Sequence, residues 1–92
     1  MQKFNYKLKT FIKAVEIISE RKNKRLEIFN KKGSGIRFEL FSLKESQPTN
    51  FWVIHTEHNS SKNITSKKDY QKASYELAVT LDEFIEALEE IK

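Results

Sequence analysis

The spacing of hydrophobic and polar residues changes several times along the chain, and each change predicts a different element. Between residues 4 and 8, three apolar side chains alternate with polar ones, which is typical of a short strand but also fits a lead-in to the next helix. From Thr10 the spacing becomes helical, with Thr10 placed as an N-cap and Asn23 as the stop. We therefore expect a helix over residues 10–22. Its apolar stripe consists of Phe11, Ile12, Val15 and Ile18.

Three segments in the middle of the chain have strand-like patterns: residues 25–30, 36–43 and 50–57. The glycines of KKGSG at 31–35 accept a positive φ, so the first two segments should pair as a hairpin. A loop with Pro48 then leads to the third segment, which is dense in β-branched and aromatic residues.

Apolar side chains occur on both faces of these predicted strands. A domain of 92 residues covers both faces of a sheet only if helices lie on each side or if a partner supplies the second cover. This surplus of apolar side chains is a reason to expect a partner molecule. One face would carry Leu26, Ile28, Phe38 and Leu40, and the other Phe29, Phe41 and Leu43.

The C-terminal part of the chain allows two interpretations. Tyr75, Leu77, Val79 and Leu81 alternate as in a strand. Thr80 and Glu83 form a T-x-x-E capping box, which favours a strand over residues 74–79 followed by a helix over residues 81–91. A single long helix over residues 67–91 is the alternative, because apolar side chains also recur at helical spacing through that range.

Together these elements predict an α+β fold in a single domain, residues 1–92, with a mobile loop at the polar, lysine-rich residues 58–72. The expected order is an N-terminal helix, an antiparallel sheet of three to five strands and a C-terminal helix, with or without a short strand before the first helix.

Composition narrows the class of protein. The absence of cysteine excludes a disulfide framework, a cysteine-ligated zinc site and thiol catalysis. The longest apolar run has four residues, at 51–54, so no membrane-spanning segment is expected. The N-terminus lacks the apolar stretch of a secretory signal. We therefore expect a cytoplasmic protein that does not bind membranes.

Charge is distributed unevenly along the chain. The formal net charge is +4, but residues 1–32 carry +7, residues 61–74 carry +3 and residues 75–92 carry −5. Lysine outnumbers arginine fourteen to three, and lysine contacts phosphate as a flexible point charge rather than reading bases in a bidentate manner. This charge pattern favours an anionic partner and, if the partner is a nucleic acid, contacts to its phosphate backbone.

Residues that could carry catalysis are few. His55, Glu57 and His58 form the one cluster that resembles a metal or acid–base site, but no third ligand is fixed by spacing, and we interpret them as surface residues at a strand end. No serine has the context of a nucleophile. We expect no enzyme activity, no metal site and no cofactor.

Aromatic residues interleaved with cations on the strands are the most suggestive feature. Such rings can stack on unpaired bases, although they also fit a core or a dimer interface. The candidate nucleic-acid-binding residues are Lys22, Lys24, Arg25, Lys31, Lys32, Arg37, Lys67 and Lys68 for phosphates and Phe41 and Trp52 for bases.

The predicted strands at 25–57 and the tail YELAVTLDEFIEALEEI resemble two families that bind single-stranded nucleic acid, the transcriptional-coactivator/Whirly group and the Pur-alpha repeat. That resemblance implies a homodimer that binds DNA or RNA along a curved sheet. Ser66, Lys67 and Lys68, followed by Ala73 and Leu77, are similar to the start of the second helix in the double-stranded RNA-binding domain, whose element order is α-β-β-β-α.

Two functional hypotheses follow. The first is a small basic protein that binds the phosphate backbone of nucleic acid with weak sequence selectivity. The alternative is a protein-interaction module without catalytic activity, such as an inhibitor, an antitoxin-like partner or an assembly subunit, which binds an acidic protein or a second copy of itself.

Overall fold

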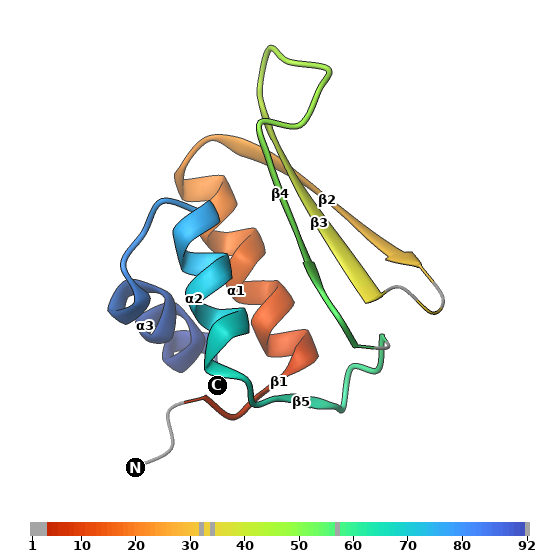
Figure 1. Ribbon diagram of the computed structural model, residues 1–92. Coiled ribbons are helices and arrows are strands. Elements are labelled where there is room, and N and C mark those ends of the chain that lie inside the picture. Colours follow the sequence, from red (N-terminus) through yellow and green to blue (C-terminus); the bar gives the residue numbers. More distant parts are fainter. Residues whose placement is uncertain (1–3, 32, 34, 57, 92) are drawn as a thin grey trace.

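Helices cover one face of a three-stranded antiparallel sheet and leave the other face open (Figure 1). The computed structural model describes residues 4–31, 33, 35–56 and 58–91. Within that part, strands β2, β3 and β4 form the sheet in this order, and β1 pairs with β5 in a separate two-stranded ribbon. The elements are β1 (Tyr6–Lys7), α1 (Leu8–Arg21), β2 (Lys24–Lys31), β3 (Gly35–Ser42), β4 (Asn50–Ile54), β5 (Asn63–Ile64), α2 (Lys67–Glu76) and α3 (Leu81–Ile91).

The register of the sheet decides which side chains enter the core. Ile28, Phe38 and Trp52 lie side by side across the three strands, and the flat stacking of Phe38 on Trp52 has a centroid distance of 5.0 Å. Both rings are buried beneath the helices. The prediction that Leu26, Ile28, Phe38 and Leu40 share one face is confirmed.

Helix α1 begins two residues earlier than predicted. Lys7, in extended conformation, occupies the N-cap position without a side-chain hydrogen bond, because pairing of β1 with β5 fixes the chain there. Thr10 is therefore inside the helix rather than its cap. The predicted stop is confirmed, since Asn23 has a φ of 57°, a conformation that asparagine tolerates well. The apolar stripe is also confirmed, with Phe11, Val15 and Ile18 buried.

A group of aromatic rings joins the helices to each other and to the sheet. Phe11 of α1 lies 5.3 Å from Tyr70 of α2 and 5.2 Å from Phe84 of α3, measured between ring centroids, with tilted edge contacts. It also lies 6.1 Å from Phe38 of β3. Such edge-to-face pairs add to the free energy of burying the rings themselves. Helix α3 packs on α1 and α2.

The strand predicted over residues 74–79 is wrong, and so is the loop predicted over residues 58–72 in its second half. The chain there forms β5 and helix α2. The alternative of one continuous helix is also wrong, because α2 ends in a Schellman turn: Ala78 has a φ of 59° and the Val79 N–H donates to the Ser74 carbonyl at 3.0 Å.

The capping box that starts α3 is confirmed. The Glu83 N–H donates to Thr80 Oγ1 at 3.1 Å, and the Thr80 N–H donates to Glu83 Oε1 at 3.2 Å. These hydrogen bonds from the Thr80 backbone and hydroxyl lower the pKa of the Glu83 carboxyl. The cap therefore separates α3 from α2 as two distinct helices.

The predicted α+β class is confirmed by this arrangement of helices and antiparallel strands. The searched part of the chain contains no helix that combines the length and the apolar character needed to cross a membrane.

Candidate nucleic-acid interface

The start of α2 is held in place by one buried side chain, Tyr70. Its hydroxyl donates to the Ile64 carbonyl of β5 and accepts the Tyr6 N–H of β1 at 3.1 Å. Its ring packs against Phe4 at 5.2 Å. Tyr70 thus fixes the first turns of α2 against the β1–β5 ribbon.

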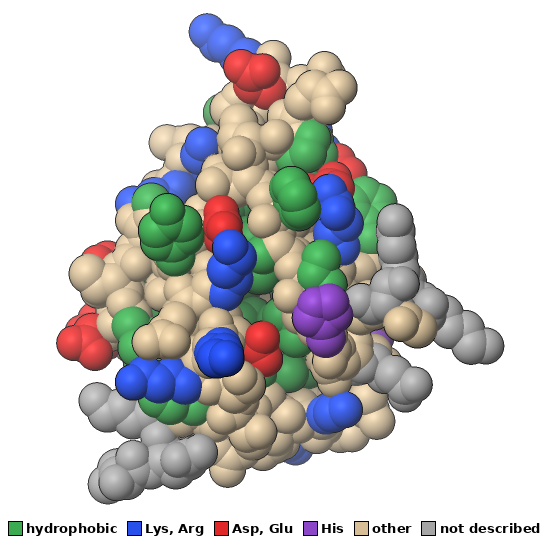
Figure 2. Space-filling view, viewed as in Figure 1, with side chains coloured by type: hydrophobic (Ala, Val, Ile, Leu, Met, Phe, Trp, Pro, Cys, Tyr) green, Lys and Arg blue, Asp and Glu red, His purple; other side chains and the backbone are tan. Residues whose placement is uncertain are grey.

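That anchoring brings exposed lysines from distant parts of the chain to one end of the molecule. Lys7 pairs with Asn63 across the ribbon, and the Leu8 N–H at the start of α1 donates to the Lys62 carbonyl at 2.7 Å. Lys67 Nζ lies 5.8 Å above the Phe4 ring. We call these residues the basic end; they are Lys7, Lys9, Lys62, Lys67 and Lys68, and all are exposed. Figure 2 shows Lys and Arg side chains gathered over α2 and around its lower end.

The end of β4 and the start of β3 lie beside the basic end. A Cβ on Gly35, whose φ is +99°, would come within 2.3 Å of the Ile54 carbonyl oxygen and 3.0 Å of the His55 Cα. Glycine is thus required where the hairpin turn folds against the end of β4. His55 also interacts electrostatically with Asp69 of α2. Burial raises the pKa of the Asp69 carboxyl, and the charge of His55 partly opposes that effect.

The cations of the basic end have no carboxylate partners in the described part of the chain, in contrast to those elsewhere. The ion pairs in that part are Arg21–Glu90, Arg25–Glu27, Arg37–Glu39 and Lys72–Glu76. None of them involves a residue of the basic end. Positive charge that is not neutralised within the protein is available to an anionic ligand.

The base-stacking role predicted for two of the site residues is wrong. Trp52 is 2% exposed and stacks on Phe38, because its register position turns it toward the helices. Phe41 is 5% exposed, and the Arg25 guanidinium covers its ring at 3.9 Å. A nucleobase cannot reach either ring in this structure.

The remaining predicted residues do not form one surface. Lys67 and Lys68 belong to the basic end, and Lys31 is the last residue of β2, at the hairpin turn. Lys22 and Lys24 lie at the opposite end of α1, and Arg25 and Arg37 are in ion pairs on the open face of the sheet. Lys32 lies outside the described residues, as does Glu57.

The sequence indicates that the basic N-terminal third and residues 62–72 contribute to binding, but it does not single out Lys7, Lys9 and Lys62. These lysines come together because β1 pairs with β5. Each of these strands has two residues, and hydrophobic periodicity does not predict that they pair. Among the described residues no group of three or more His, Asp or Glu side chains could hold a metal ion; Glu57, the third member of the histidine cluster, lies outside those residues.

The open face of the sheet is a second candidate surface. Phe29 is 40% exposed and Phe51 is 53% exposed, and the Arg37 guanidinium lies 4.1 Å above the Phe51 ring. Glu27 and Glu39 are cross-strand neighbours on this face and are each paired with an arginine. Two carboxylates at its centre make this face less suited to phosphate than the basic end.

The chain was compared with protein families, curated proteins and solved structures, and none of these comparisons found a match.

Proposed function

We propose that this protein binds nucleic acid through the basic end, with contacts mainly to the phosphate backbone and weak sequence selectivity. The observation that carries the proposal is the convergence of five exposed lysines, without carboxylate partners in the described chain, around the start of α2. A strand's phosphates provide a matching row of negative charges.

Local structure at the start of α2 supports this proposal. The N-cap residue Ser66 makes no side-chain cap hydrogen bond, and its carbonyl accepts the Asp69 N–H at 3.0 Å, which leaves the N–H groups of Lys67 and Lys68 for an anion. These N–H groups and the positive end of the helix dipole attract an anion to the same place as the charges of Lys67 and Lys68. The predominance of lysine over arginine fits contacts that position a backbone without reading bases.

Salt dependence of binding tests this function. With a labelled 12-nucleotide single strand and a duplex of equal length, we expect affinity to fall steeply with salt, with a slope of about −4 in log K against log salt for the duplex. Lys67→Gln combined with Lys68→Gln should reduce that slope by about two. No affinity of the wild-type protein at low salt would contradict the proposal.

A matched control separates a site from a general effect of charge. Lys68→Gln and Lys44→Gln remove the same charge, but Lys44 lies in the loop between β3 and β4, at the far end of the molecule from the basic end (Figure 1). The first should reduce the salt slope by about one, and the second should leave it nearly unchanged. Equal effects of the two variants would argue against a localised interface.

The second candidate function is protein interaction through the open face of the sheet. Exposed Phe29 and Phe51, flanked by arginines, favour it, because aromatic and arginine side chains are enriched at interface centres. If the partner is a second copy, sedimentation should show a concentration-dependent dimer that Phe51→Ser abolishes. A strict monomer that captures no protein partner would count against this function.

A further inference from the structure

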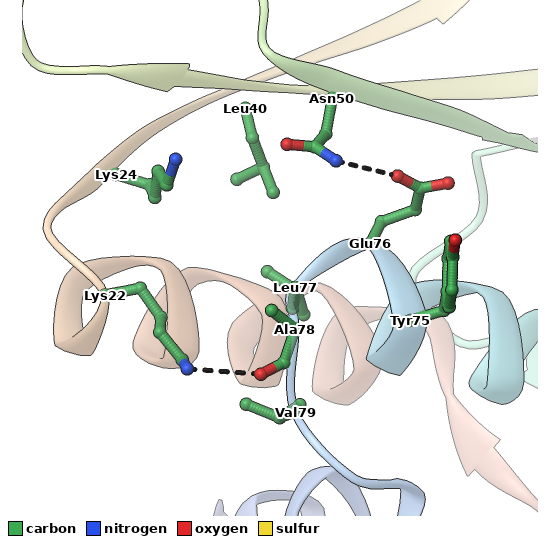
Figure 3. Close-up of a pocket in the computed structure, with 9 residues that line it drawn as sticks. All are labelled: Lys22, Lys24, Leu40, Asn50, Tyr75, Glu76, Leu77, Ala78 and Val79. Atoms are coloured by element: carbon green, nitrogen blue, oxygen red, sulfur yellow. Dashed lines mark hydrogen bonds between the residues drawn. The ribbon is translucent and has the colours of Figure 1, made fainter.

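A groove lies at the opposite end of α2 from the basic end. It has a volume of about 560 Å³ and opens between the turn that joins α1 to β2 and the turn that joins α2 to α3 (Figure 3). Buried Leu40 and Leu77 and half-buried Val79 give it an apolar lining. Volumes of this size are typical of sites for small organic ligands.

The charge of this groove is positive. Lys22 and Lys24 line one side, and neither has a carboxylate within 4.0 Å in the described chain. Lys22 Nζ donates to the Ala78 carbonyl at 3.2 Å (Figure 3). Together with the hydrogen bonds from Thr80, its charge also helps to lower the pKa of the Glu83 carboxyl, so Lys24 is the cation of the groove that remains for a ligand. The groove therefore favours a ligand with an anionic group.

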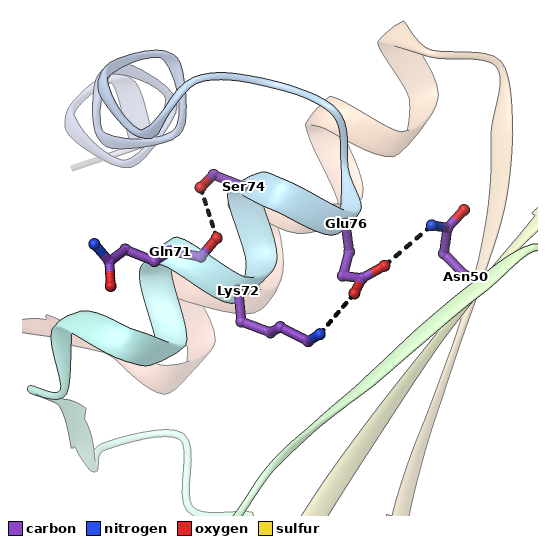
Figure 4. A network of polar contacts seen from close by, with 5 residues as sticks. All are labelled: Asn50, Gln71, Lys72, Ser74 and Glu76. Atoms are coloured by element: carbon purple, nitrogen blue, oxygen red, sulfur yellow. Dashed lines mark hydrogen bonds and ion pairs between the residues drawn. The ribbon is translucent and has the colours of Figure 1, made fainter.

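Glu76, the carboxylate that lines the groove, is already engaged. One of its oxygens accepts a hydrogen bond from Asn50 Nδ2 at 3.0 Å, and the other lies 2.8 Å from Lys72 Nζ (Figure 4). Although burial alone would raise the pKa of Glu76, the hydrogen bonds from Lys72 and Asn50 hold it below its usual value. Its negative charge is thus balanced by Lys72 and does not cancel that of Lys22 and Lys24.

Tyr75 supplies an aromatic surface at the same groove. It is 78% exposed, although it is one of the largest side chains of α2. Lys72 Nζ lies 5.9 Å from its ring centroid, so the ring stands next to the cation that follows Lys67 and Lys68 along the helix. Lys72 is paired with Glu76, so the exposed ring itself offers the surface on which an unpaired base can stack.

We infer that this groove binds one unpaired nucleotide of a strand held by the basic end, with its base stacked on Tyr75 and its phosphate at Lys24. The inference rests on the proposed function. Helix α2 has ten residues and is about 15 Å long, so a strand that leaves Lys67 passes Lys72 and reaches Tyr75 within a few nucleotides. A base inside a duplex does not offer its face to the ring, and the groove therefore selects single-stranded nucleic acid.

Variants at Tyr75 and Lys24 test the inference, measured by fluorescence anisotropy with a 12-nucleotide oligouridylate and with a duplex of equal length. Tyr75→Ala should weaken binding of the single strand about tenfold, leave binding of the duplex unchanged, and leave the salt slope unchanged. Tyr75→Phe should retain wild-type affinity, because stacking does not need the hydroxyl. Lys24→Gln should reduce the salt slope for the single strand by about 0.7.

The outcomes distinguish this inference from the proposed function. If Tyr75→Ala binds the single strand as the wild type does, while the Lys67→Gln/Lys68→Gln variant loses affinity, the nucleotide site is overturned and the basic end remains. Equal losses for single strand and duplex on Tyr75→Ala also overturn it. If the wild-type protein binds neither nucleic acid at low salt, both proposals fail.

Discussion

Helices α2 and α3 are neighbours in sequence and have ten and eleven residues, but they differ in charge and in what makes them helical. Helix α2 carries three lysines and two acids, whereas the charged residues of α3 are five acids. Helix α3 begins with a reciprocal capping box, whereas the N-cap of α2 makes no side-chain hydrogen bond. The comparison shows that α3 is specified locally and that α2 depends on packing.

The largest expected effects concern the two rings that attach these helices to Phe11. Tyr70 and Phe84 are both fully buried, so Tyr70→Ala and Phe84→Ala should each lower the free energy of unfolding by about 3–5 kcal/mol. Urea denaturation followed by circular dichroism measures both. A loss below about 1 kcal/mol for Tyr70→Ala would show that α2 does not depend on its packing.

A conservative variant sharpens this test. Tyr70→Phe keeps the ring and removes the hydroxyl that bonds to the Ile64 carbonyl and the Tyr6 N–H. We expect a loss of about 1–2 kcal/mol, because a buried carbonyl then lacks a partner. Phe84 has no such polar role, so Phe84→Leu should cost less than about 1.5 kcal/mol.

The same contrast explains how much of the fold could be predicted from the sequence. Thr80 and Glu83 lie three residues apart and form their hydrogen bonds with each other, so the start of α3 was visible as a local pattern. Tyr70 bonds to Tyr6, which lies 64 residues earlier, and no local pattern around residues 67–76 announces that bond. The alternation of Tyr75, Leu77 and Val79 therefore predicts a strand where packing makes a helix and a turn.

The candidate site could be predicted only in part for the same reason. Lys67 and Lys68 were identified from the local run of charge, but their neighbours Lys7, Lys9 and Lys62 join them through the β1–β5 pairing. Strand alternation does not reveal that the helices cover the face of Trp52, nor that the Arg25 side chain covers Phe41 on the open face. The sequence predicts Tyr75 on a strand, whereas in the folded chain it is exposed near the end of α2.

Cap substitutions give the next largest effects. Thr80→Ala should lower the free energy of unfolding by about 1 kcal/mol, because the N–H of Glu83 loses its partner. Ser66→Ala should change it by no more than about 0.3 kcal/mol, since Ser66 makes no side-chain cap bond. Equal effects of the two variants in denaturant titrations would remove the contrast between a locally specified and a packing-dependent helix.

The turn between the two helices offers a stabilising substitution. Ala78 has a φ of 59°, which costs an alanine free energy that a glycine does not lose. Ala78→Gly should therefore raise the free energy of unfolding by about 0.5 kcal/mol, even though glycine is more flexible in the unfolded chain. A lower midpoint of denaturation for this variant would contradict the Schellman geometry.

The last expected effect is a dependence on pH through the link between α3 and β1. Burial and the 2.5 Å hydrogen bond that Tyr6 donates to Glu89 raise the pKa of Tyr6 from 10.0 to about 12. Because the pKa of Tyr6 is raised in the folded state, its contribution to stability is fully present below pH 10 and is lost as pH rises through 12. Between these values the wild-type protein should lose more stability than Tyr6→Phe, as measured by denaturation at each pH; parallel curves would contradict this link.

The central claim is that nucleic acid lies against the start of α2 and not against acidic α3. Titration of the ¹⁵N-labelled protein with a 12-nucleotide single strand, followed by amide chemical shifts, tests it directly. The account predicts that the largest shifts occur at residues 7–9 and 62–72 and at His55, with further shifts at Lys24 and Tyr75 from the nucleotide in the groove, while residues 81–91 change little. Shifts concentrated on α3, or on the strands around Phe29 and Phe51 with the start of α2 unaffected, would contradict it.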